Sequence, residues 1–214
     1  MNLQPVETTL YSLSELPPAP TAPDRRVGER HMTIYRVGSL LIGDRRELCL
    51  IKNISAGGMM VRAYSPIARG TPLSVELKQG QPIAGRANWS RDANVGISFD
   101  QPIDVIDILA TVEDGRRPRM PRIELPNLVI VRDGARIHRT RACDISQGGI
   151  KVRAPVALAP DTDVVVSLAG FEPLKAVVRW CEGDLVGISF NQVLTLTRLV
   201  GWLQQQRDGA RMAG

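Results

Sequence analysis

The stretch Asn53-Ile54-Ser55-Ala56-Gly57-Gly58-Met59 returns later in the chain as Asp144-Ile145-Ser146-Gln147-Gly148-Gly149-Ile150. The offset is 91 residues, and seven of eleven positions are identical between 53–63 and 144–154. The same offset relates Val95–Phe99 to Val186–Phe190. A period of this length is too long for a solenoid unit and fits a small domain. The sequence therefore predicts two tandem copies of one fold.

Composition narrows the class of protein. The 214 residues carry a net charge of +5, with 23 Arg against 4 Lys. An excess of Arg suits bidentate recognition of phosphates or base edges, and a GC-rich genome would give the same bias. Cys49, Cys143 and Cys181 do not coincide under the offset and lack metal-ligand spacing, so we expect reduced thiols and no metal. With no apolar run of roughly 18 residues, the expected location is cytoplasmic.

Short β-prone segments separated by turn residues recur through each copy, which favours a small antiparallel barrel or sandwich. The strands expected in the first copy are 33–37, 47–54, 59–63, 72–77, 83–89 and 95–99. Those expected in the second copy are 128–131, 137–145, 150–154, 164–168, 174–180 and 185–190. Apolar residues at helical spacing then predict a closing helix for each copy. These residues are Val105, Ile108, Leu109 and Val112, and then Val193, Leu196, Leu199, Val200 and Leu203.

The expected domain boundaries follow from the repeat and from composition. Residues 1–23 form a Pro-rich tail that we expect to be disordered, with a docking segment as the alternative. Residues 24–114 form the first domain with a basic arm at its start, and 115–207 form the second. Residues 208–214 are expected to be a frayed tail.

The basic arm and the repeated turn together resemble the signature of the PilZ domain. The arm supplies Arg26-Val27-Gly28-Glu29-Arg30, and the turn supplies Asn53-Ile54-Ser55-Ala56-Gly57-Gly58. The resemblance covers about 24–112 and, less completely, 116–206. It implies two tandem six-stranded antiparallel β-barrels, each followed by a helix. It also implies a receptor for the bacterial second messenger cyclic di-GMP, with no other cofactor.

The resemblance also assigns the ligand-binding residues. The expected site is Arg25, Arg26, Arg30, Asn53, Ser55 and Gly58, with Ala56, Gly57 and Trp89 as further candidates. An arginine fork matches guanine O6 and N7 as well as phosphate oxygens. The side-chain oxygens of Asn53 and Ser55 suit the N1–H and N2–H₂ donors of guanine. The glycines permit a tight turn and close backbone approach.

Purely structural explanations of the same residues remain open. An Asn-x-Ser-x-x-Gly segment between strands also forms a turn whose side chains bond their own backbone. Trp89 and Trp180 are expected to cap the barrel cores, with contact between Trp89 and a guanine as the alternative.

The second copy departs from the family pattern. Its candidate site is Arg117, Arg122, Asp144, Ser146 and Gly149, but Pro118 faces the position of Arg26, and Arg122 lies one residue closer to its turn than Arg30. Two prolines also stiffen this arm. We therefore expect a degenerate site, and a barrel that serves as an interaction surface.

The sequence contains no recognisable catalytic constellation or phosphate-loop motif, so we expect no enzyme. The predicted function is a cyclic di-GMP effector whose arm becomes ordered on the ligand and changes contacts between domains or with an unidentified protein partner. A ligand-independent scaffold is one alternative. An Arg-rich nucleic-acid-binding module is the other, disfavoured because only three Phe, three Tyr and three Trp are available for base stacking.

Overall fold

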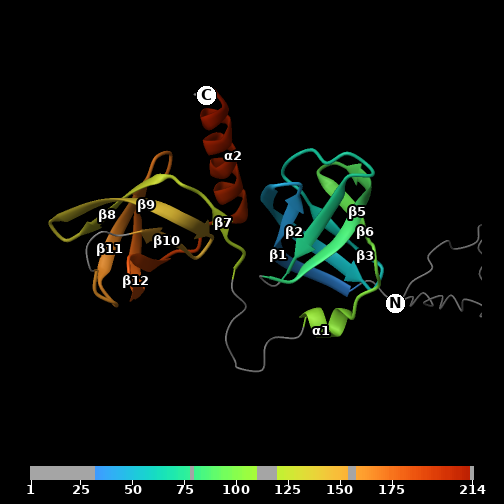
Figure 1. Cartoon of the computed structure of the whole chain (residues 1–214), viewed down its shortest axis with the longest axis horizontal. Helices are drawn as coiled ribbons and strands as arrows, with labels where there is room; N and C mark the ends of the chain where they lie inside the picture. Colours follow the sequence, from blue (N-terminus) through green and yellow to red (C-terminus); the bar gives the residue numbers. More distant parts are fainter. Residues whose placement is uncertain (1–31, 78–79, 110–119, 154–157, 213–214) are drawn as a thin grey trace, which may run out of the picture.

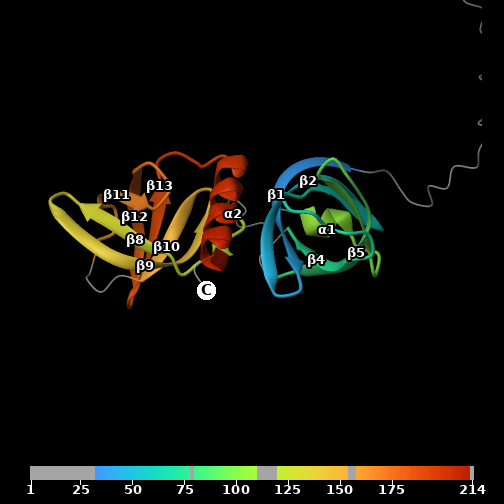
Figure 2. The same cartoon turned by 90° about the horizontal axis from the view of Figure 1, so that it is seen from above.

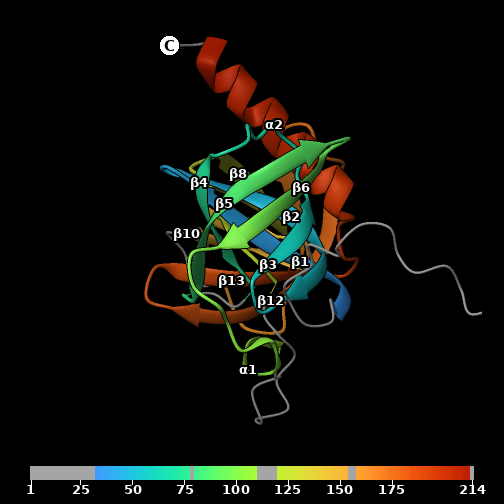
Figure 3. The same ribbon diagram turned by 90° about the vertical axis from the view of Figure 1, so that its right-hand side faces the viewer.

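A computed structural model describes residues 32–77, 80–109, 120–153 and 158–212. The first copy folds into a closed antiparallel barrel with strand order β1-β2-β3-β6-β5-β4, here called barrel one. Its strands are β1 (Met32–Ile42), β2 (Arg45–Ser55), β3 (Gly58–Arg62), β4 (Pro72–Glu76), β5 (Pro82–Arg91) and β6 (Asn94–Phe99). Figure 3 looks onto this barrel, with β5 and β6 in front.

The second copy folds into barrel two, with strand order β10-β13-β12-β11-β8-β9 closed by pairing of β9 with β10. The additional strand β7 (Ile123–Glu124) pairs with β9. The six barrel strands are β8 (Leu128–Asp133), β9 (Arg136–Ser146), β10 (Gly149–Arg153), β11 (Asp163–Leu168), β12 (Leu174–Glu182) and β13 (Leu185–Phe190). Each copy therefore forms the six-stranded barrel that the sequence predicted.

The repeat offset holds through the strand pairing and not only through the motif. Val37 pairs with Leu50 on β1 and β2, and Leu128 pairs with Arg141 on β8 and β9, both 91 residues later. Alternate residues of these strands point into the barrel, because successive side chains of a strand face opposite sides. Ile51, Val61 and Val75 are fully buried in barrel one, as Val152 and Val166 are in barrel two.

Several element boundaries differ from the prediction. Strand β1 is longer than expected, and its register with β2 shifts between Thr33 and Arg36. The part before the shift corresponds to β7 of the second copy, and the part after it corresponds to β8. The short strand β7 had not been predicted. Helix α1 (Val105–Leu109) spans five residues, and Val112 lies outside the described residues. In this region sequence periodicity indicates an apolar face but gives no length.

Helix α2 (Leu196–Met212) closes barrel two. Leu199, Trp202 and Leu203 are buried in its core, and the indole N–H of Trp202 donates to the Ala169 carbonyl over 2.7 Å. The predicted stripe is wrong at Val193, which precedes the helix and is 58% exposed. The helix also continues to Met212, past the frayed end expected from residue 207. Figures 1 and 2 both show α2 between the barrels.

Candidate functional site

The Asn53–Gly58 segment is the tight hairpin between β2 and β3. The hydroxyl of Ser55 donates to the Gly58 carbonyl over 3.2 Å, and the Met60 backbone N–H donates to Oδ1 of Asn53 over 3.1 Å. Both side chains therefore stabilise the hairpin through bonds to its own backbone, as expected for a structural turn. The carboxamide oxygen of Asn53 keeps a second lone pair, and its NH₂ group keeps two donors.

The two glycines of the turn have different roles. A Cβ atom on Gly58 would lie 2.4 Å from the carbonyl oxygen of Ile97, because Gly58 pairs with Ser98 of the neighbouring strand β6. A Cβ atom on Gly57 would meet no atom of the described residues within 4 Å. Gly58 is thus required by close approach of its neighbouring strand, whereas a side chain at Gly57 meets nothing in the described part of the chain.

Strand β1 begins beside this turn. Met32 is the first residue of β1 and pairs with Ile54, one residue before Ser55. A groove of about 770 Å³ opens here, lined by Met32, Ala56 and residues 102–106. Arg25, Arg26 and Arg30 lie outside the described residues. The described part of the site is therefore a braced turn and a groove beside the start of β1.

Trp89 is not a core residue. Its indole lies against Gly96, where a Cβ atom would come within 2.0 Å of the ring nitrogen, and the side chain is 41% exposed. Trp180 lies against Gly187 in the same way. The predicted core-capping role is wrong because a register shift between Ala87 and Trp89 turns the indole to the outer surface. No described atom joins Trp89 to the turn by a hydrogen bond.

The turn of barrel two has the same frame and different surroundings. The Ser146 hydroxyl donates to the Gly149 carbonyl over 3.3 Å, as Ser55 does in barrel one. A Cβ atom on Gly149 would lie 2.3 Å from the Ile188 oxygen. Asp144, however, is bonded by Nη1 of Arg122 at 2.5 Å and by Nζ of Lys151 at 2.7 Å. Its carboxylate is already neutralised by the chain itself.

Met120, which follows the undescribed part of the second arm, lies against the turn of barrel two. A Cβ atom on Gly148 would meet Sδ of Met120 at 3.3 Å. At the repeat offset Met120 corresponds to Glu29, which lies outside the described residues. Ile123 pairs with Ile145 as Met32 pairs with Ile54, so Arg122 corresponds in register to residue 31 and not to Arg30. Arg117 lies outside the described residues.

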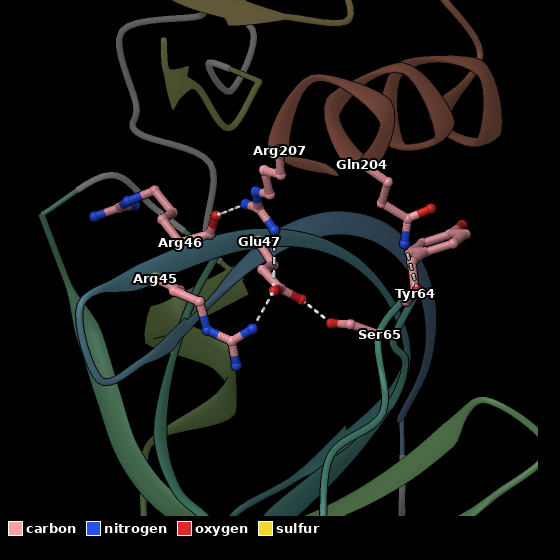
Figure 4. A network of polar contacts seen from close by, with 7 residues as sticks. All are labelled: Arg45, Arg46, Glu47, Tyr64, Ser65, Gln204 and Arg207. Carbon is pink, nitrogen blue, oxygen red and sulfur yellow. Dashed lines mark hydrogen bonds and ion pairs between the residues drawn. The ribbon is translucent and has the colours of Figure 1, made fainter. Parts of the chain in front are cut away.

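A polar network between the barrels was missed by sequence reasoning (Figure 4). Arg207 of α2 donates to Oε1 of Glu47 over 3.0 Å and to the Arg46 carbonyl over 2.7 Å. Gln204 donates to the Tyr64 carbonyl over 2.6 Å. Glu47 is buried, and Ser65 and Arg45 also contact its carboxylate. This network attaches barrel one to the helix of barrel two.

Apolar packing joins the same two elements. Leu48, next to Glu47 on β2, is 3% exposed and belongs to the apolar cluster of barrel two. One sequence signal could have shown this contact: Leu48-Cys49-Leu50-Ile51 is an unbroken apolar run, which indicates a strand covered on both faces.

The thiols and the remaining ionisable groups offer little chemistry. Burial raises the pKa of the Cys49 thiol to about 12, opposed by a weaker hydrogen bond with the backbone of Gly38. All three cysteines are free. Within the described ranges no group of three His, Cys, Asp or Glu residues has metal-site geometry. None of the helices described there is long and apolar enough to cross a membrane.

Comparison with known protein families gives a match for both halves of the chain. The family model of the PilZ domain matches residues 24–113 and again 116–205. No curated protein sequence is significantly similar to the chain. Solved structures with a similar arrangement of elements include MotI/DgrA, the inhibitor of motility of Bacillus subtilis, with 14% identity over 83% of this chain and 98% of that one, at a TM-score of 0.37.

Two further solved structures contain c-di-GMP. PlzA of Borreliella burgdorferi is 12% identical over 80% of this chain and 91% of that one, with a TM-score of 0.33. YcgR of Escherichia coli is 15% identical over 83% and 88% of the two chains, also with a TM-score of 0.33. Similarities at this level carry no argument about the site, so the two matches to the family model decide what kind of chain this is.

Proposed function

Because the chain belongs to the PilZ domain family through both of its halves, we propose that it is a cytoplasmic effector that binds cyclic di-GMP at barrel one. Cyclic di-GMP receptors of this family are non-catalytic, which agrees with an effector and not with an enzyme. The ligand is held between the arm residues Arg25, Arg26 and Arg30 and the turn of Asn53, Ser55 and Gly58. Ala56 and Gly57 line its approach.

The observation that carries this proposal is the difference in charge between the two turns. In barrel one Asn53 is uncharged and accepts from the Met60 backbone N–H, and a groove of about 770 Å³ begins beside Ala56. In barrel two Asp144 stands at the equivalent position, and Arg122 and Lys151 neutralise it. A ligand reaching the second turn has to displace contacts that the chain makes with itself.

The proposed output uses strand β2. Asn53 and Ser55 lie at one end of β2, and Glu47 lies near the other, where α2 is attached. Asn53 lies six positions after Glu47, which is a distance of roughly 20 Å along a strand. We infer that arginines drawn onto the turn by the ligand reorder the start of β1, and that the change reaches the contact between the barrels. Hydrogen exchange should then slow in β2 and change in α2 when ligand is added.

Calorimetric titration with cyclic di-GMP tests the site. Arg30→Ala should weaken binding by roughly 10–100-fold, because each charge-assisted contact contributes about 1.5–3 kcal/mol. Arg122→Ala is the matched control in the second arm, and it should leave the affinity unchanged. Equal affinity for the unaltered chain and Arg30→Ala would contradict the proposal.

A further inference from the structure

Arginines and aliphatic residues alternate on the outer face of the β8–β9 hairpin. Val129, Val131, Thr140 and Ala142 are buried on the inner face, so the residues between them point outward. Each outward cross-strand pair joins one arginine to one aliphatic residue. These pairs are Leu128 with Arg141, Ile130 with Arg139, and Ile137 with Arg132. Lys175 of β12 extends the face across β11, because it and Arg132 both pair with Val165.

The cations of this face have no acidic partners among the described residues. Arg132, Arg139, Arg141 and Lys175 make no ion pair or side-chain hydrogen bond there. Asp163 lines a pocket together with Arg132, Gly134 and Lys175, and it forms no ion pair with either cation. Leu128 and Ile137 are 62% and 63% exposed. A surface that is both apolar and unbalanced in charge indicates an interaction site.

The equivalent face of barrel one is covered by protein. At the repeat offset, Arg139 and Arg141 correspond to Leu48 and Leu50, and Arg132 corresponds to Leu41. Leu48 packs into the apolar cluster of barrel two. Next to it on β2, Glu47 pairs with Arg207 of α2. In this fold the face is therefore already used once to dock a protein element, and barrel two presents the same face with its leucines replaced by arginines.

We propose that the outer face of β8–β9 docks an acidic, amphipathic segment of a partner protein. Arginine forks pair bidentately with carboxylates, and the interleaved aliphatic residues require apolar contacts between those pairs. A nucleic acid fits less well, since the outward residues of the hairpin include no aromatic ring for base stacking. A second copy of α2 fits poorly because that helix carries Arg198, Arg207 and Arg211 against Asp208 alone.

The position of the face leaves it accessible. Figures 1 and 2 show the tip of the β8–β9 hairpin at the end of barrel two that is remote from barrel one. The proposal does not depend on nucleotide binding at barrel one, so either can fail without the other.

The test is a fluorescence-anisotropy titration of the full chain with a labelled random copolymer of glutamate and leucine. Arg139→Glu combined with Arg141→Glu should weaken binding by at least about tenfold, since two attractive contacts become repulsive. Arg86→Glu with Arg91→Glu makes the same charge change on barrel one and should leave binding unchanged. Both arginines are exposed and form no ion pair with any described residue. Leu128→Ser with Ile137→Ser should weaken binding of the copolymer but not of poly-L-glutamate.

Comparator ligands separate this partner from the others. Tighter binding of duplex DNA, or of phosphatidylglycerol vesicles, through Arg139 and Arg141 would overturn the assignment to a protein. If the Arg139/Arg141 and Arg86/Arg91 double variants lost equal affinity, net charge alone would explain the effect, and the proposal would be overturned. Absence of copolymer binding to the unaltered chain would also overturn it. Thermal unfolding of each variant confirms that the exposed substitutions leave the barrels folded.

Discussion

The two hairpin turns of this chain share a frame and differ in what surrounds it. Ser55 and Ser146 make the same hydrogen bond, and Gly58 and Gly149 meet the same close backbone. Among the described residues Asn53 is bonded to a backbone N–H, whereas the carboxylate of Asp144 is held by two cations of its own barrel. The motif therefore builds the hairpin in both copies, and the two turns differ in charge and in the partners of that charge.

The outer faces of the two barrels also differ at equivalent positions. Leu48 of barrel one is buried beneath protein, and its equivalent Arg139 in barrel two is exposed. The inward positions are mostly apolar in both copies because each barrel needs its own core. The outward positions differ between the copies, so function is to be sought there.

The largest expected effect concerns the shared frame. Gly58→Ala and Gly149→Ala should each lower the free energy of unfolding by about 2–3 kcal/mol, because the new methyl group meets a backbone carbonyl that cannot move aside. Gly57→Ala is the control and should change stability by less than about 0.5 kcal/mol. Urea unfolding measures all three. If Gly58→Ala were tolerated, the pairing of β3 with β6 would be looser than its geometry implies.

The division between inward and outward positions also explains how much could be predicted from the sequence. The repeat predicted two domains, and the alternation of apolar residues predicted short antiparallel strands that form a barrel or a sandwich, because inward positions of a strand must be apolar. The resemblance to the PilZ family selected the barrel. The contact of Arg207 with Glu47 was missed, since sequence periodicity gives no register between separate domains. The predicted role of Trp89 was wrong because a register shift turns its indole to the outer surface. The predicted role of Val193 was wrong because the helix begins only at Leu196, so Val193 is not part of its apolar stripe.

The second prediction concerns the attachment of the barrels. Arg207→Ala removes one partner of the buried Glu47 carboxylate and should destabilise the chain by about 1–2 kcal/mol. This is below the full cost of a buried unpaired charge, because Arg45 and Ser65 remain and Arg207 is itself partly exposed. Arg153→Ala breaks an exposed pair with Asp184 and should cost under about 0.5 kcal/mol. Equal effects in urea unfolding would mean that the network contributes nothing.

A reciprocal exchange tests the difference between the turns. Asp144→Asn gives barrel two the residue of barrel one and should destabilise it by about 1 kcal/mol, because Arg122 and Lys151 lose their shared carboxylate. Asn53→Asp places a carboxylate beside Met60, where barrel two has Lys151. Without that lysine it should give no stabilisation. A gain in melting temperature for Asn53→Asp would contradict the proposed difference in charge partners between the two turns.

The smallest expected effect lies inside the barrels, where Cys49 of barrel one corresponds to Thr140 of barrel two. Burial raises the pKa of the Cys49 thiol from its ordinary value of 9.0 to about 12. Below pH 9 the thiol is neutral in both the folded and the unfolded chain, so its contribution to stability is complete. As the pH rises from 9 towards 12, the unfolded thiol ionises while the folded thiol stays protonated, and that contribution is lost. Cys49→Ala should therefore lose less stability than the unaltered chain above pH 9. Thr140→Ala alters the equivalent buried position without a titrating group and should keep the original slope, so identical slopes in all three chains would show that Cys49 ionises without unfolding.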